Sequence, residues 1–361
     1  MKIWKVAVVG CGTIAEYAYL PQMKRISNAR IVAVCDSVKE RAEAFSKKFN
    51  IPEWYTDTKE MIEKCNFDIM MDLAGIQYHH KINMLALNAG KHLYSQKPFA
   101  SSVEEATEQI NTAKKNNIKF SVAPIHMIRP EIVAIKKMIE NGVIGDISLM
   151  KISFSHGGPE YFMSQTDPTW FYQEGAGALA DMGIHGLHQA TGLLGPARSV
   201  GCMAAISEPV RTVRGGPFDG KKIKADKMPD NYIINLSFSE NTLGLIDTGF
   251  IQKAWKDPIG GFEIYGTKGV ICLGGIVDYE SVSKVDVYLD SKKLGIRGWM
   301  EPVIDNNEWF QCMCIKDLIE AIEEDKPTGL PAEHGRHVID ILNKIPVSLK
   351  EEKIINIDSD F

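Results

Sequence analysis

Long apolar runs are missing from this 361-residue chain, and so is an excess of basic residues. No stretch stays apolar over the roughly 20 residues that a membrane-spanning helix needs, so the sequence predicts no membrane partner. The formal net charge of −5 argues against a broad surface for nucleic acid. Because Met1-Lys-Ile-Trp leads into a predicted strand without the apolar segment of a signal peptide, we expect a cytoplasmic protein.

Cysteine patterns are equally sparse. The seven cysteines show no Cys-x-x-Cys spacing, and Cys312-x-Cys314 has no histidine or cysteine partner at zinc spacing. We therefore expect reduced packing residues and no metal site. The apolar fraction of 45% and the charged fraction of 24% are typical of a globular protein. The chain is too long for one ordinary core, which predicts two domains.

The first turn of the chain carries the clearest motif. An apolar run over residues 3–9 ends in Gly10-x-Gly12-x-x-Ala15, and a helical pattern follows. Gly10 permits a sharp turn, Gly12 lets the backbone approach a pyrophosphate, and Ala15 lets the helix pack on the strand. A second apolar run ends in Asp36, at the distance expected for an acid that binds the adenosine ribose. Because that acid would repel a 2′-phosphate, the motif favours NAD over NADP.

Strand and helix patterns alternate through residues 1–123, which predicts a doubly wound parallel sheet, a Rossmann domain. Strand patterns dominate residues 124–361, which predicts an α+β domain with a largely antiparallel sheet. The predicted fold class is therefore α/β with these two domains. The second domain's strands are expected at residues 147–155, 199–206, 232–239, 242–248, 261–265 and 270–273, with a long loop over residues 211–229.

Two groups of residues carry chemistry. Lys97 closes a buried-looking strand, and it is either a solvated loop lysine or a proton carrier beside a nicotinamide. Asp181 and His185 share one face of a predicted helix, where they could hold a sugar hydroxyl or form a local packing pair. Trp170 could stack on a sugar face or pack at the rim, and the loop beginning at His156 could line the pocket.

Segments along nearly the whole chain carry a resemblance to a known family. They are residues 10–15, 74–79, 89–98, 136–145, 178–185 and 261–269. With them the chain resembles the Gfo/Idh/MocA oxidoreductases, the family of glucose–fructose oxidoreductase and inositol dehydrogenase. The resemblance implies hydride transfer between NAD, with NADP as the alternative, and a hydroxyl-bearing carbon of a sugar, sugar derivative or cyclitol. It also implies that the antiparallel sheet of the second domain is open and that its open face joins subunits into a homodimer or homotetramer.

The resemblance also assigns roles to single residues. Lys97 and His185 would exchange the proton and Asp181 would orient the substrate, with further substrate contacts from His126 and Trp170. The cofactor site would comprise Gly10, Gly12, Thr13, Ile14, Ala15, Asp36, Ala74, Gly75, His79, Gln96 and Lys97.

Three departures from the family pattern change the expected site. Gln96 stands where the family usually has Glu, Gly75-Ile76 alters the loop after the fourth strand, and Arg129 is a candidate for binding an acidic substrate. Two other functions stay open: an NAD-dependent glycoside hydrolase that works by transient oxidation, and a catalytically idle nucleotide sensor. The intact Lys97, Asp181 and His185 count against the sensor.

Overall fold

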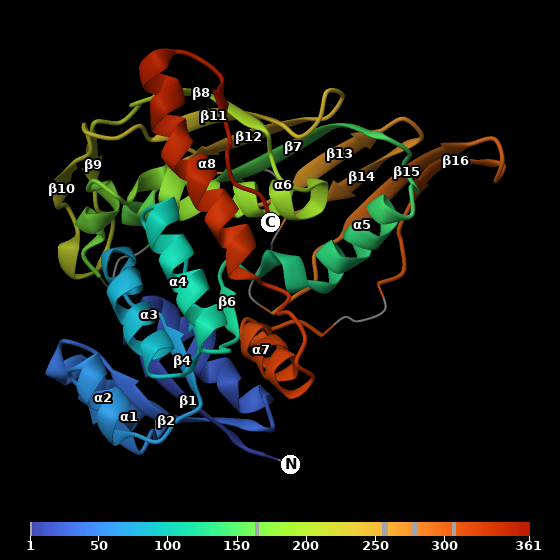
Figure 1. Ribbon diagram of the computed structural model, residues 1–361. Coiled ribbons are helices and arrows are strands. Elements are labelled where there is room, and N and C mark those ends of the chain that lie inside the picture. Colours follow the sequence, from blue (N-terminus) through green and yellow to red (C-terminus); the bar gives the residue numbers. More distant parts are fainter. Residues whose placement is uncertain (1, 163–165, 255–258, 276–279, 305–307) are drawn as a thin grey trace. The chain divides into compact units, whose positions relative to one another are not determined.

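A computed structural model describes residues 2–162, 166–254, 259–275, 280–304 and 308–361 (Figure 1). The chain forms two compact units, Met1–Ile128 with Trp309–Ile339, and Arg129–Glu308 with Asp340–Phe361. The segment 309–339 thus packs with the N-terminal strands. The division into domains at residue 123 stays a prediction.

The first unit is built on a six-stranded parallel sheet in the order β3-β2-β1-β4-β5-β6. This confirms the predicted doubly wound sheet. The strand order reverses between β1 and β4, which is the point where open α/β sheets bind ligands. The strands are β1 (Trp4–Val9), β2 (Ala29–Cys35), β3 (Glu53–Tyr55), β4 (Ile69–Asp72), β5 (His92–Ser95) and β6 (Phe120–Val122).

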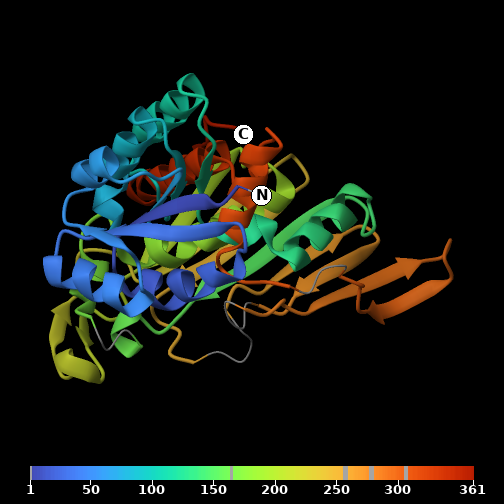
Figure 2. The ribbon, with the colours of Figure 1, turned by 90° about the horizontal axis from the view of Figure 1, so that it is seen from below.

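Helices lie on both faces of this sheet (Figure 2). Two of them begin at caps in which Asp57 and Ser102 accept hydrogen bonds from the backbone N–H groups of Glu60 and Glu105. The strand residues between the helical layers, including Val8 and Met70, are fully buried. The helices are α1 (Lys39–Phe49), α2 (Thr58–Lys64), α3 (His79–Asn88), α4 (Val103–Lys115) and α7 (Met313–Glu323), while α8 (Ala332–Glu351) contributes to both units.

The second unit contains a nine-stranded sheet in the order β16-β15-β14-β13-β7-β12-β11-β8-β17. Its pairs are antiparallel except for β7 with β12, which confirms the predicted largely antiparallel sheet. The strands are β7 (Ile147–Ser155), β8 (Ser199–Ala205), β11 (Asn231–Ser237), β12 (Leu243–Gly249), β13 (Phe262–Gly266), β14 (Gly269–Leu273), β15 (Val285–Ser291), β16 (Ile296–Met300) and β17 (Ile355–Asn356).

Two features of this unit differ from the sequence-based expectation. The segment 211–229 is not only a loop, because β9 (Val210–Thr212) and β10 (Lys222–Lys224) pair as a two-stranded antiparallel sheet. Strands β15 and β16 extend the main sheet beyond the strands that the sequence predicted. Among the described residues, no helix has the length and apolar character needed to cross a membrane.

One face of the large sheet is covered by helix. The π-helical turn η7 (Leu179–Gly183) runs into α6 (Ile184–Leu194), and α5 (Pro130–Glu140) lies beside α6. Gly186 permits this packing, because a Cβ there would lie 2.9 Å from Ile246 Cγ2 on β12. On the opposite face, Met203 and Ile233 stand in register and are 75% and 40% exposed.

Candidate functional site

The glycine turn follows β1 at the reversal point of the first sheet. Gly10 has a φ of +96°, and a Cβ there would lie 2.5 Å from the carbonyl oxygen of Leu73, just after β4. Glycine is required at this position because the two strand ends approach so closely. Gly12 differs, because a Cβ added there would meet no atom within 4 Å. Its backbone therefore borders open space, which fits the close approach of a pyrophosphate.

The helical segment after this turn is not one regular α-helix. Thr13 and Ile14 are helical, Ala15–Tyr19 form a π-helix and Leu20–Arg25 form a 3₁₀ helix. Ala15 is fully buried, as its predicted packing role requires. Since π-helical turns occur frequently at functional sites, the irregularity agrees with a binding role for this turn.

Asp36 ties the glycine turn to the end of β2. Its Oδ2 accepts a hydrogen bond from Cys11 N at 2.9 Å, and its Oδ1 accepts one from Val38 N at 2.9 Å. The Arg41 guanidinium also lies 3.1 Å from Oδ1, a contact that nothing in the sequence spacing indicated. The site that is expected to receive the adenosine ribose thus presents a carboxylate with a half-exposed arginine against it.

The loop after β4 is held by a buried pair. Asp72 Oδ1 accepts a hydrogen bond from Ala74 N at 3.0 Å, and Asp72 Oδ2 lies 2.7 Å from His79 Nδ1. His79 is 1% exposed and Asp72 is fully buried. His79 therefore holds Asp72 and the loop that carries Ala74 and Gly75, and its predicted cofactor contact stays a prediction.

Gln96 and Lys97 follow β5 and are partly buried. The Gln96 side-chain amide donates to the Tyr19 hydroxyl at 2.6 Å, and its Oε1 accepts from Lys97 N at 3.2 Å. His126 lies in the 3₁₀ turn Ile125–Ile128 after β6 and is 5% exposed.

In the second unit, Asp181 is paired with a residue that the sequence indicated only as part of a loop. Asp181 lies on the π-helical turn η7, and its Oδ2 is 3.5 Å from His156 Nε2. His156 Nδ1 accepts a hydrogen bond from Gly158 N at 3.0 Å, so the ring proton of the neutral imidazole lies on Nε2, toward Asp181. The ring of His185 stacks on Phe154, with centroids 4.9 Å apart.

The loop that carries His156 rests on a buried cluster of charges. The fully buried Arg211 side chain contacts Glu160 Oε1 at 3.0 Å and Asp230 Oδ2 at 2.7 Å, and it donates to the carbonyl of Phe250 at 2.6 Å. The Phe250 ring in turn stacks on His156 at 4.9 Å. No local sequence signal links these residues, because they come from distant segments.

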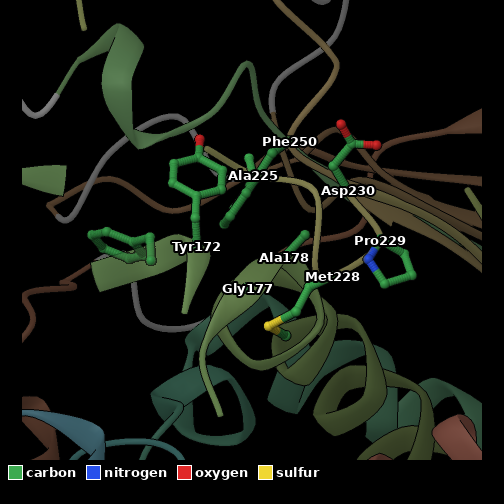
Figure 3. Close-up of a pocket in the computed structure, with 9 residues that line it drawn as sticks. Tyr172, Gly177, Ala178, Ala225, Met228, Pro229, Asp230 and Phe250 are labelled. Carbon is green, nitrogen blue, oxygen red and sulfur yellow. The ribbon is translucent and has the colours of Figure 1, made fainter. Parts of the chain in front are cut away.

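The same cluster sets the protonation states around it. Burial alone would raise the pKa of Asp230, but backbone N–H groups of Ser207 and Glu208 together with Arg211 lower it. Burial and the hydrogen bond to Glu160 raise the pKa of Tyr172 far above its usual range. Tyr172, Phe250 and Asp230, labelled in Figure 3, line a small pocket of about 10 Å³. A space of this size holds one water molecule at most.

The structure also shows the contacts of Trp170 and Arg129, two further candidates from the sequence. Trp170 is 38% exposed and stacks on Phe171 with centroids 3.7 Å apart. Arg129 is 3% exposed, lies 2.6 Å from Glu131 Oε1 and donates to the carbonyl of Ser281 at 2.8 Å. The guanidinium of Arg129 is therefore engaged inside the protein, and its proposed contact with an acidic substrate stays a prediction.

Sequence profiles of known families match both parts of the chain. A profile described as "Oxidoreductase family, NAD-binding Rossmann fold" matches residues 4–123. A second profile, described as "GFO/IDH/MocA C-terminal domain", matches residues 132–272. Together the two matches cover more than half of the chain.

Individual relatives agree with these profiles. The D-xylose dehydrogenase of Paenarthrobacter nicotinovorans is 26% identical over 66% of this chain and 61% of that protein. The myo-inositol 2-dehydrogenase of Thermotoga maritima is 21% identical over 98% of both chains. A solved levoglucosan dehydrogenase, in complex with NADH and L-sorbose, superposes with a TM-score of 0.82 at 21% identity over 99% of each chain, which shows the shared fold.

Proposed function

This chain belongs to the Gfo/Idh/MocA family of NAD-binding oxidoreductases, and we propose that it moves a hydride between NAD and a hydroxyl-bearing carbon of a sugar, sugar derivative or cyclitol. The observation that carries the proposal is the turn at the reversal point of the first sheet. There Gly12 faces open space, and Asp36 stands at the end of β2. The named activities of the relatives, D-xylose and myo-inositol oxidation, support the substrate class.

The residues around the turn fit the cofactor. Asp36 would bind the adenosine ribose, and the backbone from Gly12 to Ala15 would hold the pyrophosphate, with Ala74 and Gly75 on the neighbouring strand end. Gln96 and Lys97 would lie at the nicotinamide end. When bound, NAD supplies the hydride acceptor.

The proton of the oxidised hydroxyl needs a separate acceptor. In our proposal Lys97 or His185 takes this proton, and Asp181 orients the hydroxyl by accepting a hydrogen bond from it. His156 directs its Nε2–H toward Asp181, with 3.5 Å between Nε2 and the carboxylate Oδ2. Trp170 would pack against a face of the sugar, and His126 would contribute a polar contact.

A panel of sugars and cyclitols, followed at the absorbance band of NADH, tests the proposal. We expect net NADH formation with at least one neutral polyol, and a roughly 10²–10⁴-fold lower turnover in Lys97→Ala, Asp181→Asn and His185→Ala. Lys119→Ala is a matched control, because this lysine forms a surface pair with Asp325. Glycoside cleavage without net NADH would identify a hydrolase instead. NAD binding without any turnover across the panel would identify a sensor.

We further propose that the open face of the large sheet joins copies of this chain into a homodimer or homotetramer. Met203, Ile233 and Trp299 are 75%, 40% and 60% exposed on its strands, and such apolar groups favour an interface. Light scattering should therefore show an oligomer that Ile233→Lys weakens. A monomer at micromolar concentration would contradict this assembly.

A further inference from the structure

A buried polar cluster lies directly beneath Gln96 in the first unit. The Tyr19 hydroxyl receives the side-chain N–H of Gln96 at 2.6 Å and that of Gln311 at 3.0 Å, and it lies 2.8 Å from the hydroxyl of Tyr94. Tyr19 and Tyr94 are fully buried and Gln311 is 8% exposed. The cluster joins three separate segments: the π-helix after the glycine turn, the end of β5, and the residues before α7.

The hydrogen bonds in this cluster have one consistent direction. Lys97 N–H must donate to Gln96 Oε1, so the amide nitrogen of Gln96 is the atom that faces Tyr19. The Tyr19 oxygen thus accepts hydrogen bonds from two amide groups, and its own O–H donates to the Tyr94 hydroxyl. Burial raises the pKa of both tyrosines well above its usual value, so both hydroxyls are protonated at neutral pH.

We propose that Tyr19 and Gln311 are positioning residues for Lys97 that act through the side chain of Gln96. Tyr19 fixes the rotation of the Gln96 amide, and the carbonyl oxygen of that amide accepts a hydrogen bond from the backbone N–H of Lys97. Gln311 fills the second acceptor position of Tyr19 and so prevents the hydroxyl from turning away. The inference deepens the proposed function, because it rests on Lys97 as a proton carrier.

The position of Tyr19 also connects this cluster with the glycine turn. Tyr19 is the last residue of the π-helix that begins at Ala15, immediately after the turn expected to hold the pyrophosphate. A change at the glycine turn can therefore reach Lys97 through one helical turn and one side-chain amide. The two bonds on Tyr19 thus connect the cofactor-binding backbone with the residue that handles the proton.

Tyr19→Phe and Tyr94→Phe form a matched pair of variants. Each removes one buried hydroxyl, but only Tyr19→Phe removes the acceptor of the two amide groups. We expect Tyr19→Phe to lower kcat about tenfold with little change in KM or in the NAD dissociation constant, and Tyr94→Phe to lower kcat less than twofold. In a double-mutant cycle, Tyr19→Phe should add almost nothing to the loss caused by Gln96→Ala, because both act through one side chain. Equal losses in the matched pair, or additive losses in the cycle, would overturn the proposal.

A measurement without turnover separates this proposal from the proposed function. Hydrogen exchange of the Lys97 amide, followed by NMR in the unliganded protein, should become roughly fivefold faster in Tyr19→Phe, the change expected for about one lost hydrogen bond. Tyr94→Phe should leave that rate unchanged. If Tyr19→Phe does not fold, Gln311→Met serves in its place, because it keeps the side-chain length and removes one donor. An unchanged Lys97 exchange rate in the folded variant refutes the positioning role, whether or not a substrate has been found.

Discussion

Removal of the Asp36 carboxylate should change which cofactor this protein prefers. In the structure the Arg41 guanidinium lies 3.1 Å from Asp36 Oδ1, although more than half of its side chain is exposed. Asp36 thus has two effects on the cofactor: it offers acceptors to the ribose hydroxyls, and it neutralises an arginine that would otherwise attract a 2′-phosphate. In Asp36→Ser both effects disappear together, and Arg41 becomes available to the phosphate.

The magnitudes follow from the two contacts. Hydrogen bonds to a charged group contribute about 1.5–3 kcal/mol, so Asp36→Ser should weaken NAD binding roughly 10- to 100-fold. The half-exposed Arg41–Asp36 pair contributes at most about 1 kcal/mol, so Arg41→Ala alone should change NAD binding less than about fivefold. NADP binding should tighten in Asp36→Ser and weaken again when Arg41→Ala is added.

Isothermal titration of all four proteins with NAD and NADP measures these changes. Asp36→Asn is a useful control, because it keeps one side-chain acceptor for Cys11 N or Val38 N but removes the charge. Equal affinity of the natural protein for NADP and NAD would contradict this role of Asp36. An unchanged ratio of the two dissociation constants in Asp36→Ser would contradict it as well.

Three shorter predictions test other parts of the structure. Gly12→Ala should lose NAD binding but keep the midpoint of thermal unfolding, because a Cβ at this position meets no other atom. Gly10→Ala should lose NAD binding and also lower the midpoint, because a Cβ there meets the backbone of Leu73. Thermal melts and NAD titrations that show equal effects of the two variants would contradict this. Arg211→Leu should lower the free energy of unfolding in urea by about 3–5 kcal/mol, because two buried carboxylates lose their cation. Burial raises the pKa of the Asp317 carboxyl to about 6, so the folded protein favours its protonated form. The free energy of unfolding is therefore highest below about pH 4, and this stability is lost as the pH rises through 6. Asp317→Asn should remove that loss, at most about 3 kcal/mol, and unfolding curves at pH 4 and 7 will show whether it does.

The fold was predictable where the pattern is local. The alternation over residues 1–123 and the strand at 147–155 both follow from periodicity, and the structure confirms the parallel sheet and gives β7 those bounds. Strand β15 shows the same signal, because Val285, Val287 and Leu289 are buried while the residues between them are more exposed. That alternation could have predicted it.

The contacts within the candidate site could not be predicted in this way. His156 and Asp181 meet because β7 and η7 lie together in the folded unit, and Arg211 joins Glu160 and Asp230, which lie 51 and 19 residues away in the sequence. The π-helical turn at Asp181 could not be predicted either, because the periodicity of the sequence predicts a regular α-helix there. Pairings over such separations depend on the packed fold, and single-residue patterns do not encode them.

Gln96 is the departure from the family pattern whose meaning changes most with the structure. The sequence indicates only a lost negative charge, but the structure shows an amide that donates to Tyr19 and accepts from Lys97 N at the same time. In Gln96→Glu the carboxylate can still accept from Lys97 N, and it can accept from Tyr19 if the two tyrosines reverse their hydrogen bond. The variant should therefore fold.

The new carboxylate should raise the pKa of the Lys97 ammonium, because a nearby opposite charge favours the charged form. If neutral Lys97 accepts the substrate proton, the rise of the oxidation rate with pH moves to higher pH in Gln96→Glu. The measurement is kcat against pH at saturating NAD for the natural protein and the variant, with Gln96→Met as an uncharged control. The buried tyrosines keep their protons throughout, so they add no step to either profile. An unmoved profile in a folded variant would leave His185 as the base and Lys97 as an electrostatic contact only.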